Sequence, residues 1–167
     1  DNRPMVSSLF RAVPSEHYSA IKDLFINIQK EMNVPMEVIN DGEVTALAGA
    51  MSVGEGSILG IALGSSEAAG FIDAEMHVTG WLNELAFAPI DYSPEAPIDA
   101  WSGDRGCGAS YFSQQAVFRL APRAGIEILA ELSDAEKLKF VQDKLEAGDE
   151  GARKIWQSMG VYLGYGL

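Results

Sequence analysis

Cysteine is almost absent from this chain of 167 residues, which contains a single one, Cys107. One thiol cannot form an intramolecular disulfide bond, and it cannot supply the several ligands of a structural zinc site. The sequence therefore predicts a protein without zinc, in a reducing, cytoplasmic compartment.

Basic residues are also scarce. The chain has 12 Lys and Arg against 24 Asp and Glu, so its formal net charge is −12. An acidic surface repels nucleic-acid backbones and anionic membranes, and we expect neither as a partner of this segment. A local cluster of backbone N–H groups can still hold the phosphate of a small molecule, so the charge excludes partners without naming one.

Long apolar runs are missing as well. The best candidate, Ile58 to Leu63, is interrupted by Gly60 and followed by Gly64. It is far shorter than the roughly 20 residues that span a bilayer. We expect no contact with a membrane.

The two ends of the given sequence show no targeting segment and no helix end. Asp1 to Pro4 contains no initiator Met and starts no apolar targeting segment, while Met159 to Leu167 has the pattern of a helix that continues. We expect the chain to be an internal fragment of a longer protein.

Apolar spacing predicts a helix, a strand and a second helix in the first third of the chain. The first helix runs from Ser15 to about Asn33, with apolar residues at steps of three and four. The β-branched stretch Pro35 to Ile39 predicts a strand, and a small-residue helix from about Glu43 to Met51 follows it.

The next segment has the pattern of an antiparallel hairpin. Strands are predicted at Ser57 to Leu63 and at Ala69 to Asp73, joined by the turn Gly64 to Glu67. A third strand is predicted at Met76 to Thr79.

The rest of the chain is predicted to be an irregular excursion followed by helices. Residues 89–105 carry three prolines and little periodicity, which makes them the segment most prone to disorder. The predicted helices are Ala109 to Leu120, one that starts with a capping box at Ser133 to Glu136 and ends at Gly148, and one capped by Asp149. Together these elements predict one mixed α/β domain.

Asn40 and Asp41 stand where the predicted strand opens into a loop, a common position for ligand sites in α/β proteins. A carboxylate there could orient a substrate hydroxyl and accept its proton. Alternatively, Asp41 caps the helix that follows.

Two further groups allow a functional and a structural interpretation. Gly64, Ser65 and Ser66 offer N–H groups and hydroxyls for a phosphate, but they also make an ordinary hairpin turn. Glu84 lies in an apolar segment, so it either faces solvent or contacts a ligand or a donor.

Other polar residues carry weaker signals. Arg105 to Gly108, before a helix, could place a cation and N–H groups near an anion or serve as a flexible helix start. His17 and His77 have no second ligand at metal spacing and are interpreted as structural.

The order and spacing of these segments resemble the middle of a ROK-family protein (repressor, open reading frame, sugar kinase), from about Ser15 to the end. The family belongs to the hexokinase and actin-like ATPase superfamily. The stretch Pro-Met-Glu-Val-Ile-Asn-Asp, followed by a helix with Ala46, is similar to the family's "pV-x-v-x-N-D-a-n-a-a-A" element. The resemblance implies that Asp41 is the catalytic base and that Asn40 contacts the sugar.

Two more stretches support this resemblance. Leu63 to Asp73 is similar to the family's hairpin "l-G-T-G-i-G-g-G-i-i-i-d", which implies phosphate contacts for Gly64, Ser65 and Ser66. Asn83 to Phe87 aligns with "G-E-i-G-H", which implies that Glu84 contacts the sugar. Phe87 replaces the His that serves as a sugar and zinc ligand.

The family pattern "C-x-C-G-n-r-G-C-l-E-a-y-a-S" falls on Ala100 to Ser113 without a gap, but its key side chains are replaced. Ala100 and Ser102 stand at two zinc cysteines, and Ala109 stands at a sugar-binding Glu. Only Cys107 remains of four zinc ligands. The resemblance therefore implies a divergent member without zinc.

The resemblance implies a ribonuclease-H-like α/β domain. Residues 1–167 would form part of it, without the N-terminal phosphate loop and the C-terminal adenosine-binding part. The intact protein would use ATP and Mg²⁺ to phosphorylate a hexose-type sugar, as a glucokinase-like kinase, and this chain alone would be inactive.

Two alternatives to the kinase remain open. One is a non-catalytic, sugar-sensing transcriptional regulator, and the other is a degenerate kinase-like scaffold, to which the replacements Phe87 and Ala109 point. The partners implied by the resemblance are a sugar and a nucleotide, with a homodimer as a further possibility.

Overall fold

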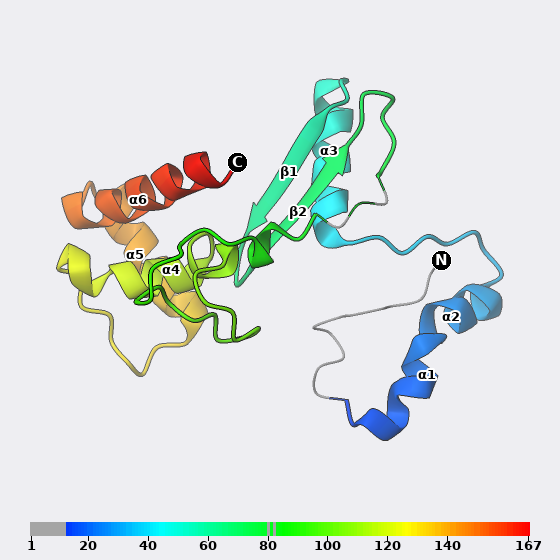
Figure 1. Cartoon of the computed structure of the whole chain (residues 1–167), viewed down its shortest axis with the longest axis horizontal. Helices are drawn as coiled ribbons and strands as arrows, with labels where there is room; N and C mark the ends of the chain where they lie inside the picture. Colours follow the sequence, from blue (N-terminus) through cyan, green and yellow to red (C-terminus); the bar gives the residue numbers. More distant parts are fainter. Residues whose placement is uncertain (1–12, 80, 82) are drawn as a thin grey trace. The chain divides into compact units, whose positions relative to one another are not determined.

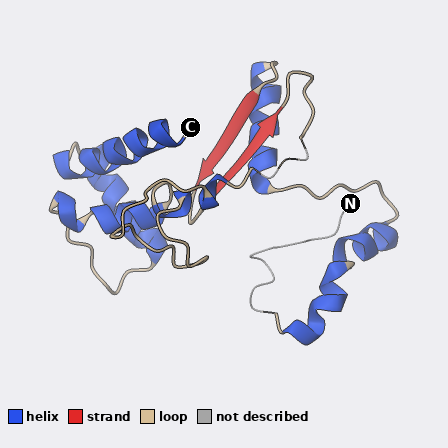
Figure 2. Ribbon diagram, viewed as in Figure 1, coloured by secondary structure: helices blue, strands red, loops and turns tan. Residues whose placement is uncertain are grey.

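The computed structural model describes residues 13–79, 81 and 83–167. The chain divides into two compact units, Asp1–Asn40 and Asp41–Leu167, and each is described by itself. Figure 1 gives the element labels, and Figure 2 separates helices from strands and loops.

The described part of the first unit is helical and then irregular. It contains a 3₁₀ turn, η2 (Ser15–His17), and two helices, α1 (Tyr18–Lys22) and α2 (Leu24–Met32). The single helix predicted here is therefore interrupted, at Asp23, whose φ of −109° and ψ of 12° leave the helical range. No residue of these three elements is fully buried, and Ile21, Phe25 and Ile28 of the predicted stripe are half-buried.

The strand predicted at residues 35–39 is wrong. Residues 35–40 have no regular secondary structure, and they follow Asn33, which ends α2 in the left-handed conformation with φ 51°.

The second unit begins with a helix packed on a hairpin. Helix α3 (Asp41–Val53) is followed by strands β1 (Ile58–Leu63) and β2 (Glu67–Ile72). The strands pair antiparallel from Ile58 opposite Ile72 to Leu63 opposite Glu67, which confirms the predicted hairpin. Figure 1 shows α3 running along this two-stranded sheet.

Glycines allow α3 to approach the hairpin closely. A Cβ at Gly42 would collide with the backbone of Ala69, and one at Gly70 would collide with the backbone of Glu43. A Cβ at Gly60 would likewise meet the backbone of Ala46. Such contacts are open only to residues without a side chain. They fix the start of α3 against β2.

The third strand predicted at Met76 to Thr79 is reduced to one bridge, between Ile72 and Val78. The carboxylate of Asp73 accepts hydrogen bonds from the N–H groups of Glu75 and His77, at 3.0 and 2.8 Å. This side-chain turn bends the chain before a ladder can form.

The segment predicted to be irregular has no helix or strand, but it is held by many hydrogen bonds. It lies between two 3₁₀ turns, η3 (Leu85–Phe87) and η4 (Gly108–Ser110). Isolated bridges join Pro89 to Cys107 and Ile98 to Arg105. The structure gives no support to disorder here.

Three helices form the largest apolar core of the second unit. They are α4 (Gln114–Leu120), α5 (Asp134–Glu146) and α6 (Glu150–Gly166), with the 3₁₀ turn η5 (Pro122–Ala124) after α4. The helix predicted from Ala109 begins later, because Ser113 caps it and accepts a hydrogen bond from the Gln115 N–H. The buried core residues are Val117, Ala121, Ile126, Val141, Ala152 and Ile155.

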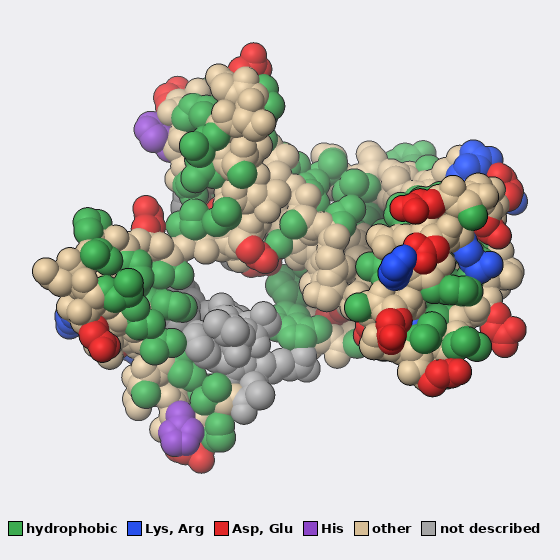
Figure 3. Space-filling view, turned by 180° about the vertical axis from the view of Figure 1, so that it is seen from behind, with side chains coloured by type: hydrophobic (Ala, Val, Ile, Leu, Met, Phe, Trp, Pro, Cys, Tyr) green, Lys and Arg blue, Asp and Glu red, His purple; other side chains and the backbone are tan. Residues whose placement is uncertain are grey.

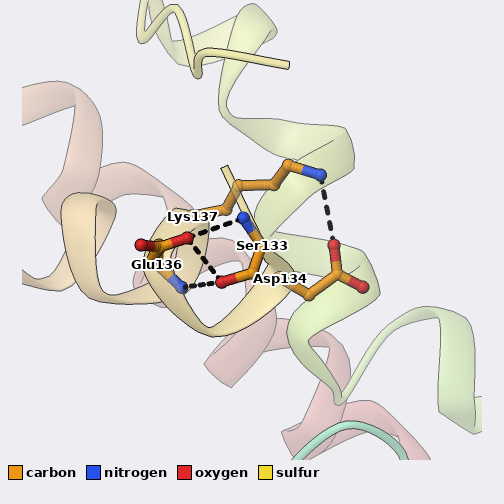
Figure 4. A network of polar contacts seen from close by, with 4 residues as sticks. All are labelled: Ser133, Asp134, Glu136 and Lys137. Carbon is orange, nitrogen blue, oxygen red and sulfur yellow. Dashed lines mark hydrogen bonds and ion pairs between the residues drawn. The ribbon is translucent and has the colours of Figure 1, made fainter. Parts of the chain in front are cut away.

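The predicted capping box at the start of α5 is confirmed (Figure 4). The Ser133 N–H donates to the Glu136 carboxylate at 2.8 Å, and the Glu136 N–H donates back to the Ser133 hydroxyl at 3.4 Å. Lys137 adds an ion pair with Asp134 at 3.2 Å. These contacts satisfy the N–H groups that a helix start leaves without partners.

Charges of both signs are interspersed on the helical end of the second unit, as Figure 3 shows. Two of the ion pairs there are Lys139 with Asp143 and Arg153 with Glu150. None of the described helices is long and apolar enough to cross a membrane.

Candidate functional site

Asp41 is the first residue of α3 and is exposed. Its carboxylate accepts a hydrogen bond of 3.0 Å from the N–H of Gly42, and its carbonyl accepts one of 2.9 Å from the Thr45 hydroxyl. The acidic group stands at the positive end of the helix dipole, an arrangement that stabilises a helix. Because Gly42 lies against Ala69, Asp41 is held beside the first half of β2.

Glu84 lies just before η3 and is half-buried. Burial raises the pKa of its carboxyl, and the negative charges of Asp41 and Glu43 raise it further. The negative charge of Asp41 therefore acts on Glu84, although the two residues are far apart in the sequence.

Asn40 is the residue before Asp41 in the chain, and it is exposed. It is the last residue of the first unit, so the site described here is built from the second unit alone.

The turn Gly64 to Ser66 closes the hairpin, and Ser65 and Ser66 are exposed. The Gly64 N–H donates to the Ser66 carbonyl at 2.8 Å, and the Gly64 carbonyl accepts from the Gln114 N–H at 2.9 Å. The second bond ties the turn to the first residue of α4. Both interpretations of this turn therefore stay open, because it is a structured hairpin turn that also presents two hydroxyl groups.

A groove of about 240 Å³ lies between this turn and the helices. Its polar residues come from the turn, α4 and α5, and they include Gly64, Gln114 and Gln142. Trp156 and Met159 of α6 are among the apolar residues that line it. A largely apolar groove with a few polar groups can take a flat, largely apolar ring.

The residues at the family's zinc positions do not gather into a metal site. Cys107 is buried, whereas Ala100 and Ser102 are exposed. In the described parts of the chain, no three His, Cys, Asp or Glu side chains come together in a way that could hold a metal ion. Phe87 stacks on Trp101, with 5.7 Å between the ring centroids.

The weaker candidates have structural roles or face solvent. Arg105 donates hydrogen bonds from its guanidinium to the carbonyls of Pro94 and Ala96, at 2.9 and 2.8 Å, and so fastens the irregular segment. His77 lies 3.5 Å from Asp73, and His17 is exposed.

Glu67 is a polar residue that sequence reasoning missed. It begins β2 and is only 5% exposed, yet neither carboxyl oxygen has a hydrogen-bond partner in the described part of the chain. Burial raises the pKa of this carboxyl to about 7. In the sequence Glu67 follows a Gly-Ser-Ser turn, where a solvated acid is expected, so nothing local signals its burial.

Comparisons with known proteins give matches among solved structures alone. No protein-family model matches the chain, and no curated protein matches it. Among solved structures, a similar fold occurs in a protein described as the ROK family transcriptional regulator, homolog of E. coli MLC protein. The TM-score is 0.65 at 21% sequence identity, and the alignment covers 87% of this chain and 38% of that one.

This likeness shows the fold. The chain is a mixed α/β structure, with a two-stranded antiparallel sheet and helices, that shares the fold of part of a ROK-family protein. It spans well under half the length of that neighbour. The activity and ligands of the whole protein are therefore matters for proposal.

Proposed function

We propose that this chain is part of a ROK-type protein that binds a sugar and transfers a phosphoryl group from ATP to one of its hydroxyls. The observation that carries the proposal is the pairing of Asp41 with Glu84 beside the hairpin. The shared fold with a ROK-family protein supports it. Residues 1–167 would be part of a ribonuclease-H-like ATPase domain.

Asp41 has the exposure that a catalytic base requires. An ionised carboxylate can accept the proton of a sugar hydroxyl and orient its oxygen for attack. Glu84, whose pKa is raised, holds a proton more readily and can donate a hydrogen bond to a second hydroxyl. Phosphoryl transfer depends mainly on such positioning.

The groove and the turn fit a nucleotide in part. Trp156 and Met159 offer apolar surface for a base, and the hydroxyls of Ser65 and Ser66, with the backbone of Gly64, can face phosphates. Bound ATP with Mg²⁺ would supply the phosphoryl group and neutralise its charge. No described residue is assigned to the metal, because no three His, Cys, Asp or Glu side chains come together in the described parts of the chain.

A second candidate is a sugar-responsive regulator without kinase activity. The printed description of the structural neighbour, a transcriptional regulator, favours it. The sugar would occupy the same acidic site. The two candidates differ in whether Asp41 does chemistry or only binds.

The test is release of ADP by the full-length protein with Mg-ATP and a panel of hexoses and amino sugars. We expect sugar-dependent release that falls by roughly 100-fold or more in Asp41→Asn, because general-base catalysis contributes about that much. Glu55→Gln is the matched control, since Glu55 is exposed and lies beyond the other end of α3. It should retain full activity.

Isothermal titration of the same sugars separates the two candidates. Sugar binding without ADP release would replace the kinase with the regulator. If a well-folded protein showed no sugar binding and no ADP release, both candidates would be contradicted for these sugars.

A further inference from the structure

Glu67 sits between the hairpin and the two 3₁₀ turns. Its side chain points to the face of the hairpin opposite α3, because Gly70 and Gly60 occupy the face that α3 covers and residues alternate along a strand. On that opposite face it meets η4. A Cβ at Gly108 would lie 2.6 Å from Oε2 of Glu67. Gly108 therefore leaves the space that the carboxyl group fills.

The carbonyl oxygen of Leu85 borders the same space. A Cβ at Gly108 would collide with this oxygen as well, so the carbonyl and Oε2 of Glu67 lie around one point. The carbonyl already accepts one hydrogen bond, from the Ala88 N–H at 3.0 Å, and a carbonyl oxygen has a second lone pair. A protonated Glu67 has an acceptor beside it, whereas an ionised Glu67 faces another electronegative oxygen.

Among the described residues, no charged group contributes to the pKa of Glu67, although Arg119 of α4 donates a hydrogen bond of 2.8 Å to the carbonyl of Ser110 in η4. Strand β1 has no titratable residue. Cys107 precedes η4, and the acidic residues on the other neighbouring elements are Glu84 before η3 and Asp41 and Glu43 on α3. Burial alone accounts for the raised pKa of Glu67, with no contribution from any of these groups.

Turn η4 contains a second buried polar group. The hydroxyl oxygen of Ser110, in η4, is buried without a hydrogen-bond partner in the described part of the chain. A buried polar group without a partner costs free energy, and an ionised one costs much more. The buried carboxyl group of Glu67 therefore favours its neutral form.

We propose that Glu67, Leu85 and Gly108 form a proton-dependent latch, which holds the hairpin against η3 and η4 while Glu67 is protonated and loosens when it ionises. The proposal goes beyond the proposed function and does not depend on it. The latch lies one residue after the turn Gly64 to Ser66, so its opening would change the mobility of that turn.

The pH range of the latch follows from the sign of the shift. The pKa of Glu67 is about 7 in the folded chain and 4.5 as a reference value. Since the folded state binds the proton more tightly, its stability falls as the pH rises between these values and levels off above them. From pH 6 to pH 8 the equilibrium constant for closing the latch should fall about tenfold.

Hydrogen exchange of the full-length protein at pH 6 and pH 8, corrected for intrinsic exchange rates, measures this directly. We expect protection of residues 64–72 and 84–110 to fall about tenfold in the wild type and to stay constant in Glu67→Gln, which cannot ionise. Glu67→Leu replaces the carboxyl by an apolar group and should also stay constant. Residues 134–146 of α5 give the reference for global opening.

A ¹³C titration of the Glu67 carboxyl by NMR does not depend on a variant that folds. A midpoint near pH 7 supports the latch. A midpoint near 4.5, or the same pH dependence of protection in the wild type and both variants, overturns it.

Discussion

The carboxylate of Asp99 accepts a hydrogen bond of 2.8 Å from the side-chain amide of Gln115, and this bond ties the irregular segment to α4. The other oxygen of Asp99 accepts from the N–H groups of Trp101 and Ser102, at 3.2 and 2.6 Å. Burial acts to raise the pKa of Asp99, but the bonds from Ser102, Gln115 and Trp101 outweigh it and the pKa is lowered. Asp99 is thus a buried, ionised anchor.

Replacing Gln115 by Ala should lower the free energy of unfolding by about 1–3 kcal/mol, because it leaves a buried carboxylate oxygen without its partner. Urea denaturation measures the loss. Gln114→Ala is the control, since only the backbone N–H of Gln114 bonds to Gly64. It should change stability by less than about 0.5 kcal/mol. Equal effects of the two substitutions would contradict the anchor.

The same anchor has a pH signature. Because the folded pKa of Asp99 is lowered, its contribution to stability is present above the reference value of 3.8 and is lost as the pH falls through the folded pKa. The difference in the free energy of unfolding between the wild type and Gln115→Ala should therefore become smaller in acid, and urea denaturation at several pH values measures it.

The bond between Asp99 and Gln115 could not be predicted from the sequence of residues 89–105. Prolines and the lack of periodicity correctly predicted that no helix or strand forms. They also suggested disorder, which was wrong. Asp99 and Gln115 are 16 residues apart, so no local sequence pattern indicates their hydrogen bond. Local signals served well elsewhere. The capping box at Ser133 and the cap at Asp149 depend on neighbours within three residues, and both are confirmed.

Tertiary context explains the remaining differences. The pattern of residues 35–39 is that of a strand, but these residues have no regular secondary structure. Glu67 follows turn residues, and its burial depends on Leu85 and Gly108, which are distant in the sequence. Asp41 and Glu84 were each predicted as site residues, partly from the family resemblance, and only packing shows that they interact.

The close approach of α3 to β2 predicts opposite effects for two glycines of this helix. Gly42→Ala should destabilise by about 1–3 kcal/mol or more, because its Cβ would overlap the backbone of Ala69. Gly49 meets only the Ile58 side chain, at 3.6 Å, so Gly49→Ala should stabilise by about 0.5–1 kcal/mol through helix propensity. Thermal denaturation of both variants checks the sign. A tolerated Gly42→Ala would show that α3 does not lie on the hairpin as described.

The acidic site makes a prediction that needs no substrate. The charge of Asp41 helps to raise the pKa of Glu84, so Asp41→Asn should lower that pKa toward its ordinary value. Glu43→Gln should lower it less, because Glu43 contributes less than Asp41, and Glu55→Gln should leave it unchanged. A ¹³C titration of the Glu84 carboxyl measures all three. If Asp41→Asn left the midpoint where it is, Asp41 and Glu84 would not share a site, and the proposed roles of base and sugar contact would lose their structural basis.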